Sequence, residues 1–186
     1  MKRIVLFIVA TFFMLGLAAQ TPHLKFMGIP LDGTINSFQT KLTQKGFTPD
    51  ATTNRQIGVG VRCFIGGTFS GEKASVFVYY NPKTKIVYRA KAVIESSTES
   101  YIDNLYNKLK KSIGDKYKSR SEFESSYHDG HASGAYYIWK DDVELLGRID
   151  LYVTKPISYL DNRCLHIDYW DLLNSNKNDK QNSDDL

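Results

Sequence analysis

The chain has 186 residues, of which 42% are hydrophobic and 24% charged, with 13 Gly, 5 Pro and 2 Cys. This composition is that of a globular protein and excludes a collagen, a disordered tail protein or a disulfide-dense miniprotein, and the length fits one domain of about 100–200 residues. The net charge is +4, and without Lys2 and Arg3 only 22 basic residues face 20 acidic ones. This balance does not predict a nucleic-acid partner.

Residues 1–20 have the pattern of a secretory signal peptide. Lys2 and Arg3 precede an apolar run over residues 4–17, after which small residues follow. The run is shorter than the roughly 20 residues that span a bilayer, so an uncleaved anchor is the less favoured alternative. No cysteine for lipid attachment stands near the end of this segment. We therefore expect a periplasmic or secreted protein without a stable membrane anchor, cleaved after Ala18, Ala19 or Gln20.

The next part of the chain predicts one helix and three strands. Apolar residues at Ile35, Phe38 and Leu42 recur at helical spacing and predict a helix over residues 34–46. Thr34 is a suitable N-cap for it. Alternation of apolar and polar residues then predicts three antiparallel strands, over residues 59–65, 73–80 and 85–94.

The same pattern then starts again. A second amphipathic helix is predicted over residues 98–117, with a stripe that begins at Ile102 and ends at Ile113. Four strand-like runs follow, over residues 122–127, 135–140, 144–154 and 163–172. We interpret the two stretches as structural pseudo-repeats, over about residues 31–95 and 96–173. The polar end, residues 174–186, predicts disorder.

These elements predict a single α+β domain over residues 21–173. Each helix carries one apolar stripe, and each strand has one apolar face. The arrangement that buries both is an antiparallel sheet of about seven strands with the two helices packed on one face. The other face would then be open to solvent or to a partner.

Parts of the sequence and its overall layout resemble known families. The segment GTINSF at residues 33–38, followed by Leu42 and Gly46, resembles the helix opening of the SmpA/OmlA-type outer-membrane assembly lipoproteins. The duplicated helix-plus-strands layout is similar to the β-lactamase inhibitor protein fold. More closely, residues 26–173 resemble a group of uncharacterised secreted proteins of Gram-negative gut anaerobes, with a Gly-Ile-Pro-x-Asp-Gly opening at 28–33 and a Gly-Thr-Phe-x-Gly turn at 67–71. The resemblance implies a fold and an exported location, and it carries no activity.

The open face of the predicted sheet is the candidate binding surface. By alternation it carries aromatic and arginine residues, the types that dominate interface centres, at Arg62, Phe64, Tyr79, Arg89, Tyr137, Trp139, Arg148, Tyr152, His166 and Trp170. Phe77, Lys91, Asp150 and Asp168 share this face. The alternative is that cross-strand pairs merely stabilise a half-exposed sheet. An error of one residue in the alternation would move these side chains into the core.

Other clusters of reactive residues give weaker indications of a function than the open face does. His128 and His131 flank Asp129-Gly130, and two imidazoles with a carboxylate could bind a metal such as zinc, but no further ligand is assignable. Asp-Gly is a typical hairpin turn, which is the reading we favour. A hydrolytic site would have to use His166 with Asp168 or with Cys164. A metal-binding or hydrolytic protein is therefore the alternative to a binding protein.

The two cysteines are predicted to remain unpaired. In an exported protein Cys63 and Cys164 would often form a disulfide. Alternation places Cys63 on the helix-facing side of its strand and Cys164 on the open side. Because a disulfide needs Cα atoms within about 7 Å, we expect no bridge.

The densest charge is a basic run on and after the second helix, formed by Lys108, Lys110, Lys111, Lys116, Lys118 and Arg120. We interpret it as the solvated face of an amphipathic helix. No catalytic or cofactor motif is present, so the sequence predicts a non-enzymatic protein without a cofactor. The expected partner is another envelope or extracellular protein, and a subunit of a self-assembly is a third alternative.

Overall fold

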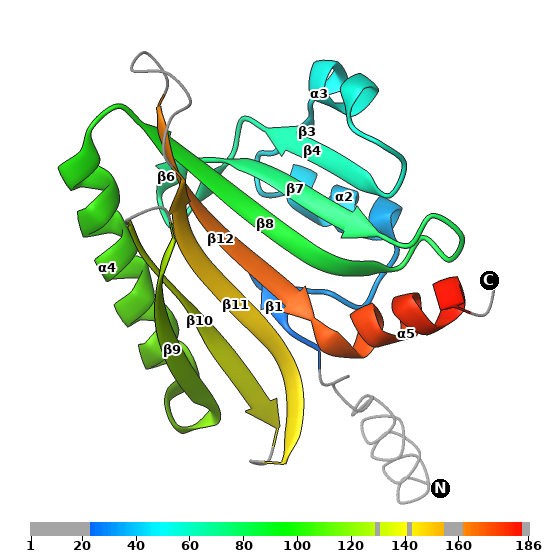
Figure 1. Ribbon diagram of the computed structural model, residues 1–186. Helices are drawn as coiled ribbons and strands as arrows, with labels where there is room; N and C mark the ends of the chain where they lie inside the picture. Colours follow the sequence, from blue (N-terminus) through cyan, green and yellow to red (C-terminus); the bar gives the residue numbers. More distant parts are fainter. Residues whose placement is uncertain (1–22, 129–130, 141–142, 155–161, 184–186) are drawn as a thin grey trace, which may run out of the picture.

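The computed structural model describes residues 23–128, 131–140, 143–154 and 162–183 (Figure 1). The fold is α+β, as predicted, and is built on an eight-stranded antiparallel sheet with the strand order β3-β4-β7-β8-β12-β11-β10-β9. These strands are, in chain order, β3 Thr48–Pro49, β4 Val61–Ile65, β7 Ser75–Tyr80, β8 Val87–Ser96, β9 Ser121–His128, β10 His131–Lys140, β11 Glu144–Thr154 and β12 Arg163–Asp171. The predicted signal peptide lies outside the described residues.

Two small hairpins stand apart from the sheet. The first pairs β1 Lys25–Phe26 with β2 Ile29–Pro30, and the second pairs β5 Thr68–Phe69 with β6 Glu72–Lys73. Each turn has two residues with positive φ, Met27 (52°) and Gly28 (80°) in one, Ser70 (52°) and Gly71 (89°) in the other. Two positive φ angles are typical of the type I′ turn, whose twist suits a tight hairpin.

Helix α2 (Ile35–Thr43) and helix α4 (Glu99–Tyr117) occupy the two segments predicted to be helical. Thr34 caps α2 by accepting a hydrogen bond from the Ser37 amide at 3.4 Å. The buried side chains of both helices belong to the same apolar cluster as the buried residues of β7, β8, β11 and β12. Helix α4 contacts β8, β11 and β12 directly. In the described ranges, no helix combines the length and apolar character needed to cross a bilayer.

Two further helices were not predicted, α3 (Ala51–Gln56) and α5 (Leu172–Ser183), with a 3-10 turn at Lys118–Arg120. Disorder was predicted from residue 174 onward, and this was wrong for the part of the segment that belongs to α5. Asn174 is only 8% exposed, and its Nδ2 donates to the carbonyls of Leu31 (2.7 Å) and Val87 (3.3 Å). The sequence did not indicate this helix because the segment has few apolar residues. A polar side chain that hydrogen-bonds to buried carbonyls does not contribute to a hydrophobic pattern.

The last residue of β12 holds the chain segment before α2 in place through hydrogen bonds. Asp171 is fully buried and accepts hydrogen bonds from the amides of Leu24 and Asn174, both at 3.0 Å. The Nδ1 atom of His23 lies 2.9 Å from the same carboxylate. Burial raises the pKa of Asp171, and these hydrogen bonds act against that rise. One carboxylate thus joins the first and last described segments.

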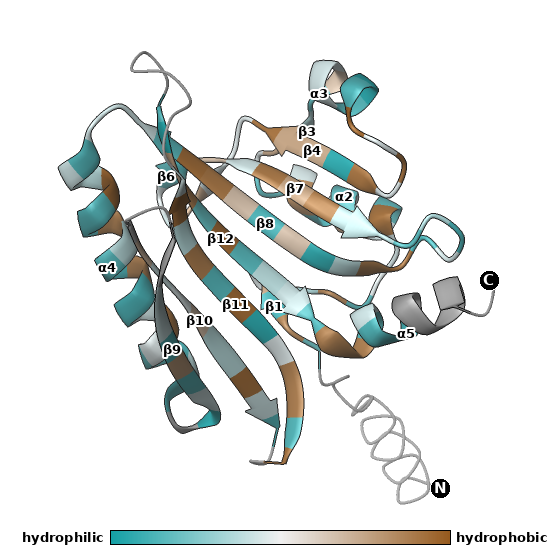
Figure 2. Cartoon of the chain, viewed as in Figure 1, coloured by the Kyte–Doolittle hydropathy of each residue, from teal (hydrophilic) through white to brown (hydrophobic). Residues whose placement is uncertain are grey.

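Strand pairing assigns every side chain to one of two faces. One row across the sheet consists of Phe64, Val76, Ala92, Ile167 and Leu151, all fully buried. We call this side the core face. The adjacent row consists of Cys63, Phe77, Lys91, Asp168 and Asp150, and we call its side the open face. Figure 2 shows the resulting alternation of hydrophobic and hydrophilic residues along β8, β12 and β11.

Candidate functional site

The open face carries most of the residues that the sequence predicted for binding. Pairing across β7, β8, β12, β11 and β10 forms one row of cations and aromatic rings, made up of Tyr79, Arg89, Trp170, Arg148 and Tyr137. Tyr152 and His166 pair in another row of the same face, and Trp139 follows Tyr137 by two residues on β10. All of these side chains are intermediate in exposure. Helix α3 adjoins β4, where the Asn54 side chain hydrogen-bonds to the backbone N–H and carbonyl of Cys63.

Two predicted residues, Arg62 and Phe64, lie on the core face instead. Arg62 pairs with Val78, and its Nη1 donates to Asn36 Oδ1 (3.2 Å) and Gln39 Oε1 (2.7 Å) on α2. Phe64 is 0% exposed. The prediction was wrong because it took the apolar set of Val59, Val61, Cys63 and Ile65 as core-facing, although Val59 is 81% and Ile65 39% exposed. A change of one residue in the alternation exchanges the two faces.

An alternating stack of rings and guanidinium groups spans the middle of the open face. The Arg89 guanidinium lies 4.2 Å from the Tyr79 ring centroid and 3.9 Å from that of Trp170. The Arg148 guanidinium lies 5.7 Å from the same Trp170 centroid. Asp168, which is 1% exposed, accepts from Arg89 Nε at 2.9 Å and from Nη2 at 2.5 Å. A bidentate carboxylate and two rings fix Arg89 in one orientation.

The neighbouring rows are fixed in a similar way. The rings of Tyr152 and His166 stack at 4.5 Å with an interplanar angle of 6°. Burial lowers the pKa of His166 to about 4, and the charge of Lys91 adds to the effect. Burial, followed by the charge of Asp168, raises the pKa of Tyr152 to about 12. Both rings are therefore neutral near pH 7.

Asp150 lies in the row next to Arg148 and is paired with it. Arg148 Nε lies 2.9 Å from Asp150 Oδ1. Burial nevertheless raises the pKa of Asp150, with Arg148 opposing and Asp168 adding to the rise. The carboxylate therefore carries its charge at a cost, and an additional cation beside it would stabilise that charge.

The residues proposed for the alternative hydrolytic site do not form a dyad. His166 Nε2 lies 2.9 Å from Thr154 Oγ1, whereas Asp168 is bound to Arg89. The side chains of His128 and His131, with the Asp129-Gly130 turn, lie outside the described residues. Within the described part of the chain, no three His, Cys, Asp or Glu side chains are grouped as a metal site requires.

Cys63 and Cys164 are both free thiols. The reason that the sequence suggested was wrong, since pairing places both residues on the open face. They stand on β4 and β12, which β7 and β8 separate. Three strand spacings amount to about 14 Å, twice the Cα separation that a disulfide allows.

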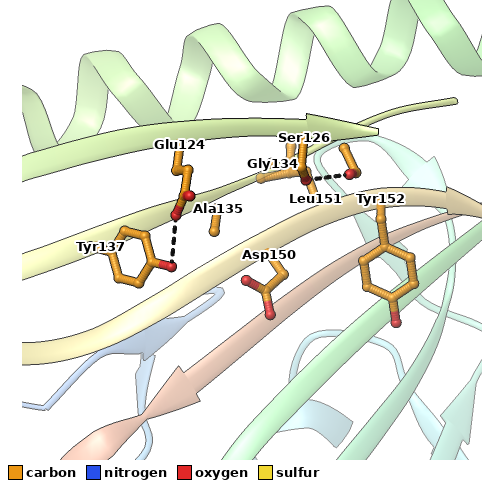
Figure 3. A pocket seen from close by; sticks show the side chains of 9 residues that line it. Glu124, Ser126, Gly134, Ala135, Tyr137, Asp150, Leu151 and Tyr152 are labelled. Carbon is orange, nitrogen blue, oxygen red and sulfur yellow. Dashed lines mark hydrogen bonds between the residues drawn. The ribbon is translucent and has the colours of Figure 1, made fainter. Parts of the chain in front are cut away.

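Two adjoining hollows open on the open face beside the edge strand β9. The first, of about 430 Å³, has small residues at its centre, Ser126, Ser133 and Ala135, and is bounded by Tyr137 and Tyr152. Figure 3 shows Asp150 between these two tyrosines, with the Tyr137 hydroxyl donating to Glu124. That hydrogen bond measures 3.1 Å. The hollow forms because small side chains lie between large aromatic ones.

The second hollow, of about 610 Å³, shares Glu124 and Tyr137 with the first and is also lined by Glu122, Trp139 and Leu145. Among the described residues, the charged ones lining the two hollows are the acids Glu122, Glu124 and Asp150. We call the pair the acidic hollows. Sequence reasoning missed Glu122 and Glu124, although their alternation with Ser126 already placed all three on one face.

Comparison with known proteins found no matching family model, curated protein or solved structure for this chain. The geometry of the open face is therefore the basis on which a function can be proposed.

Proposed function

We propose that this chain is an exported, non-enzymatic binding protein, and that a protein partner inserts a lysine or arginine side chain into the acidic hollows. The observation that carries the proposal is the lining of these hollows, in which aromatic rings stand beside acids and none of the described lining residues is basic. A carboxylate and a ring face both attract a cation, and together they favour ammonium or guanidinium groups over neutral or anionic ones.

The stack of Tyr79, Arg89, Trp170 and Arg148 supports this proposal by its rigidity. Each member is held by a neighbour on the next strand. A surface that is ordered before binding loses less side-chain entropy when the partner arrives. The same contacts would also stabilise the sheet without any partner, so the stack supports the proposal only together with the acidic hollows.

The proposal also includes that the protein is exported and that its domain consists of two helix-plus-strands repeats. The pattern of residues 1–20 supports export through a cleaved signal peptide. The strand order supports two repeats, because β4, β7 and β8 run inward from one edge after α2. After α4, strands β9 to β12 run inward from the other edge, so that β8 and β12 meet at the centre.

Site-specific photo-cross-linking in cells that naturally produce the protein tests the binding surface. A benzophenone amino acid at Trp139 should give an adduct with one partner protein, whereas the same group at Val59, which is 81% exposed and lies away from the hollows, should not. An adduct at Val59 alone, or at neither position, would rule out this surface.

The purified partner then tests the chemistry. Glu122→Gln combined with Glu124→Gln should weaken its binding about tenfold, since two charges facing a cation are lost. The matched control is Asp103→Asn with Asp115→Asn on α4, which also removes two negative charges from exposed positions, and it should bind as the wild type does. Equal affinity of all three proteins would show that the partner does not use a basic side chain here.

A further inference from the structure

A further cavity lies on the other side of the molecule, between α4, β12 and the tips of the two small hairpins. It has a volume of about 320 Å³ and is lined by Met27, Phe69, Ser70, Leu109, Ser112, Ile113, Lys116 and Tyr169. We call it the hairpin crevice. Its volume is at the lower end of the range for small-molecule sites, about 300–1,000 Å³.

The floor of the hairpin crevice is apolar and rigid. Phe69, Leu109 and Ile113 are each no more than 6% exposed. The Phe26 ring fixes two floor residues at once, lying 5.5 Å from the Phe69 ring and 5.4 Å from that of Tyr169. A fixed apolar floor favours an aliphatic or aromatic group, because burying it removes apolar surface from water.

The rim consists of two strained hairpin tips. Met27 and Ser70 both have φ of 52°, a conformation that costs non-glycine residues free energy and is enriched at ligand-binding sites. The Tyr101 hydroxyl on α4 donates to the Glu72 carboxylate of the second hairpin. This contact joins one side of the rim to the helix.

One end of the crevice is polar and positively charged. Tyr169 lines this end, is only 4% exposed, and has a pKa that burial raises. Burial, and after it the charge of Lys25, lowers the pKa of Lys116. Neither lysine has a carboxylate partner among the residues that the structure describes. Lys116 Nζ instead lies 5.0 Å from the Tyr117 ring centroid.

We infer that the hairpin crevice binds a single-chain amphipathic anion, an aliphatic chain ending in a carboxylate. The chain would lie on Phe69, Leu109 and Ile113. Lys116, Lys25 and the Tyr169 hydroxyl would face the carboxylate. This site is independent of the acidic hollows, and it gives Lys116 a role that differs from the rest of the basic run, where Lys111 is paired with Asp115 at 2.5 Å.

Calorimetric titration of the purified protein with decanoate, kept below its micelle concentration, tests the inference. We expect saturable binding that weakens about fourfold for each methylene removed from the chain. Decanol, which has the same chain without the charge, should bind less tightly than decanoate. Absence of saturable binding, or equal binding of decanol, would overturn the inference.

Three variants locate the site. Lys116→Gln should weaken decanoate binding roughly five- to tenfold, whereas Lys111→Gln, on the same helix but outside the crevice, should leave it unchanged. Ser112→Phe places a ring in the crevice from an exposed helix position and should abolish binding while the fold is retained in circular dichroism. Equal binding by Lys116→Gln and Lys111→Gln, or undiminished binding by Ser112→Phe, would place the ligand elsewhere.

Discussion

At the scale of single residues, His166 makes the stability of the fold depend on pH. Its ring stacks on Tyr152, and it pairs with Val93 on β8, two residues from Lys91 on the same face. Its pKa is about 4 in the fold against an ordinary value of 6.5. Between these values the unfolded chain binds a proton that the folded ring does not, so the free energy of unfolding falls as the pH is lowered from 6.5 to 4.

We predict that the wild type loses about 1 to 3 kcal/mol of stability across this range through His166. His166→Phe, which keeps a ring against Tyr152, should reduce the loss by that amount in urea unfolding at pH 7.5, 5.5 and 4.5. Tyr152→Phe is the control, because it keeps both the stack and the titrating histidine. If His166→Phe and the wild type lose stability in parallel, the histidine is not the source.

At the scale of elements, the stability of α5 depends on its first turn. Asn174 hydrogen-bonds to the carbonyl of Leu31, before α2, and to that of Val87, in β8. Asn174→Ala leaves two buried carbonyls without this donor, which should cost about 1–3 kcal/mol in urea unfolding. Asn176→Ala, at an exposed position of the same helix, should change stability by less than about 0.5 kcal/mol. Equal costs for both variants would show that this turn does not fasten the helix.

The helices and strands differ in how far the sequence alone predicts them. The stripe of Ile102, Leu105 and Ile113 locates α4, because helical periodicity depends only on near neighbours. Long strands such as β11 are found for the same reason. The hairpin β1–β2 and helix α5 were missed because their stability comes from Asp171 and Asn174 contacts with residues more than 80 positions away.

At the scale of the whole molecule, the candidate surface depends on which face each strand presents. On the long strands the alternation is unambiguous, so Tyr79, Arg89 and Trp170 were placed correctly on the open face. On the short strand β4 the small apolar Cys63 suits either face, and Arg62 and Phe64 were therefore misplaced. The acidic hollows and the hairpin crevice could not be predicted at all, since each needs strands or helices that only the fold brings together.

The central pairing of β8 with β12 also fixes the order in which the molecule can be completed. Ribosomes make β8 long before β12, and the two are the neighbours at the middle of the sheet. Until the last strand arrives, the edge of β8 that will pair with β12 over residues 89–96 stays open, and an open edge is a template for wrong association between chains. We therefore expect an unfinished chain to expose an open sheet edge for longer than an up-and-down meander of the same size would.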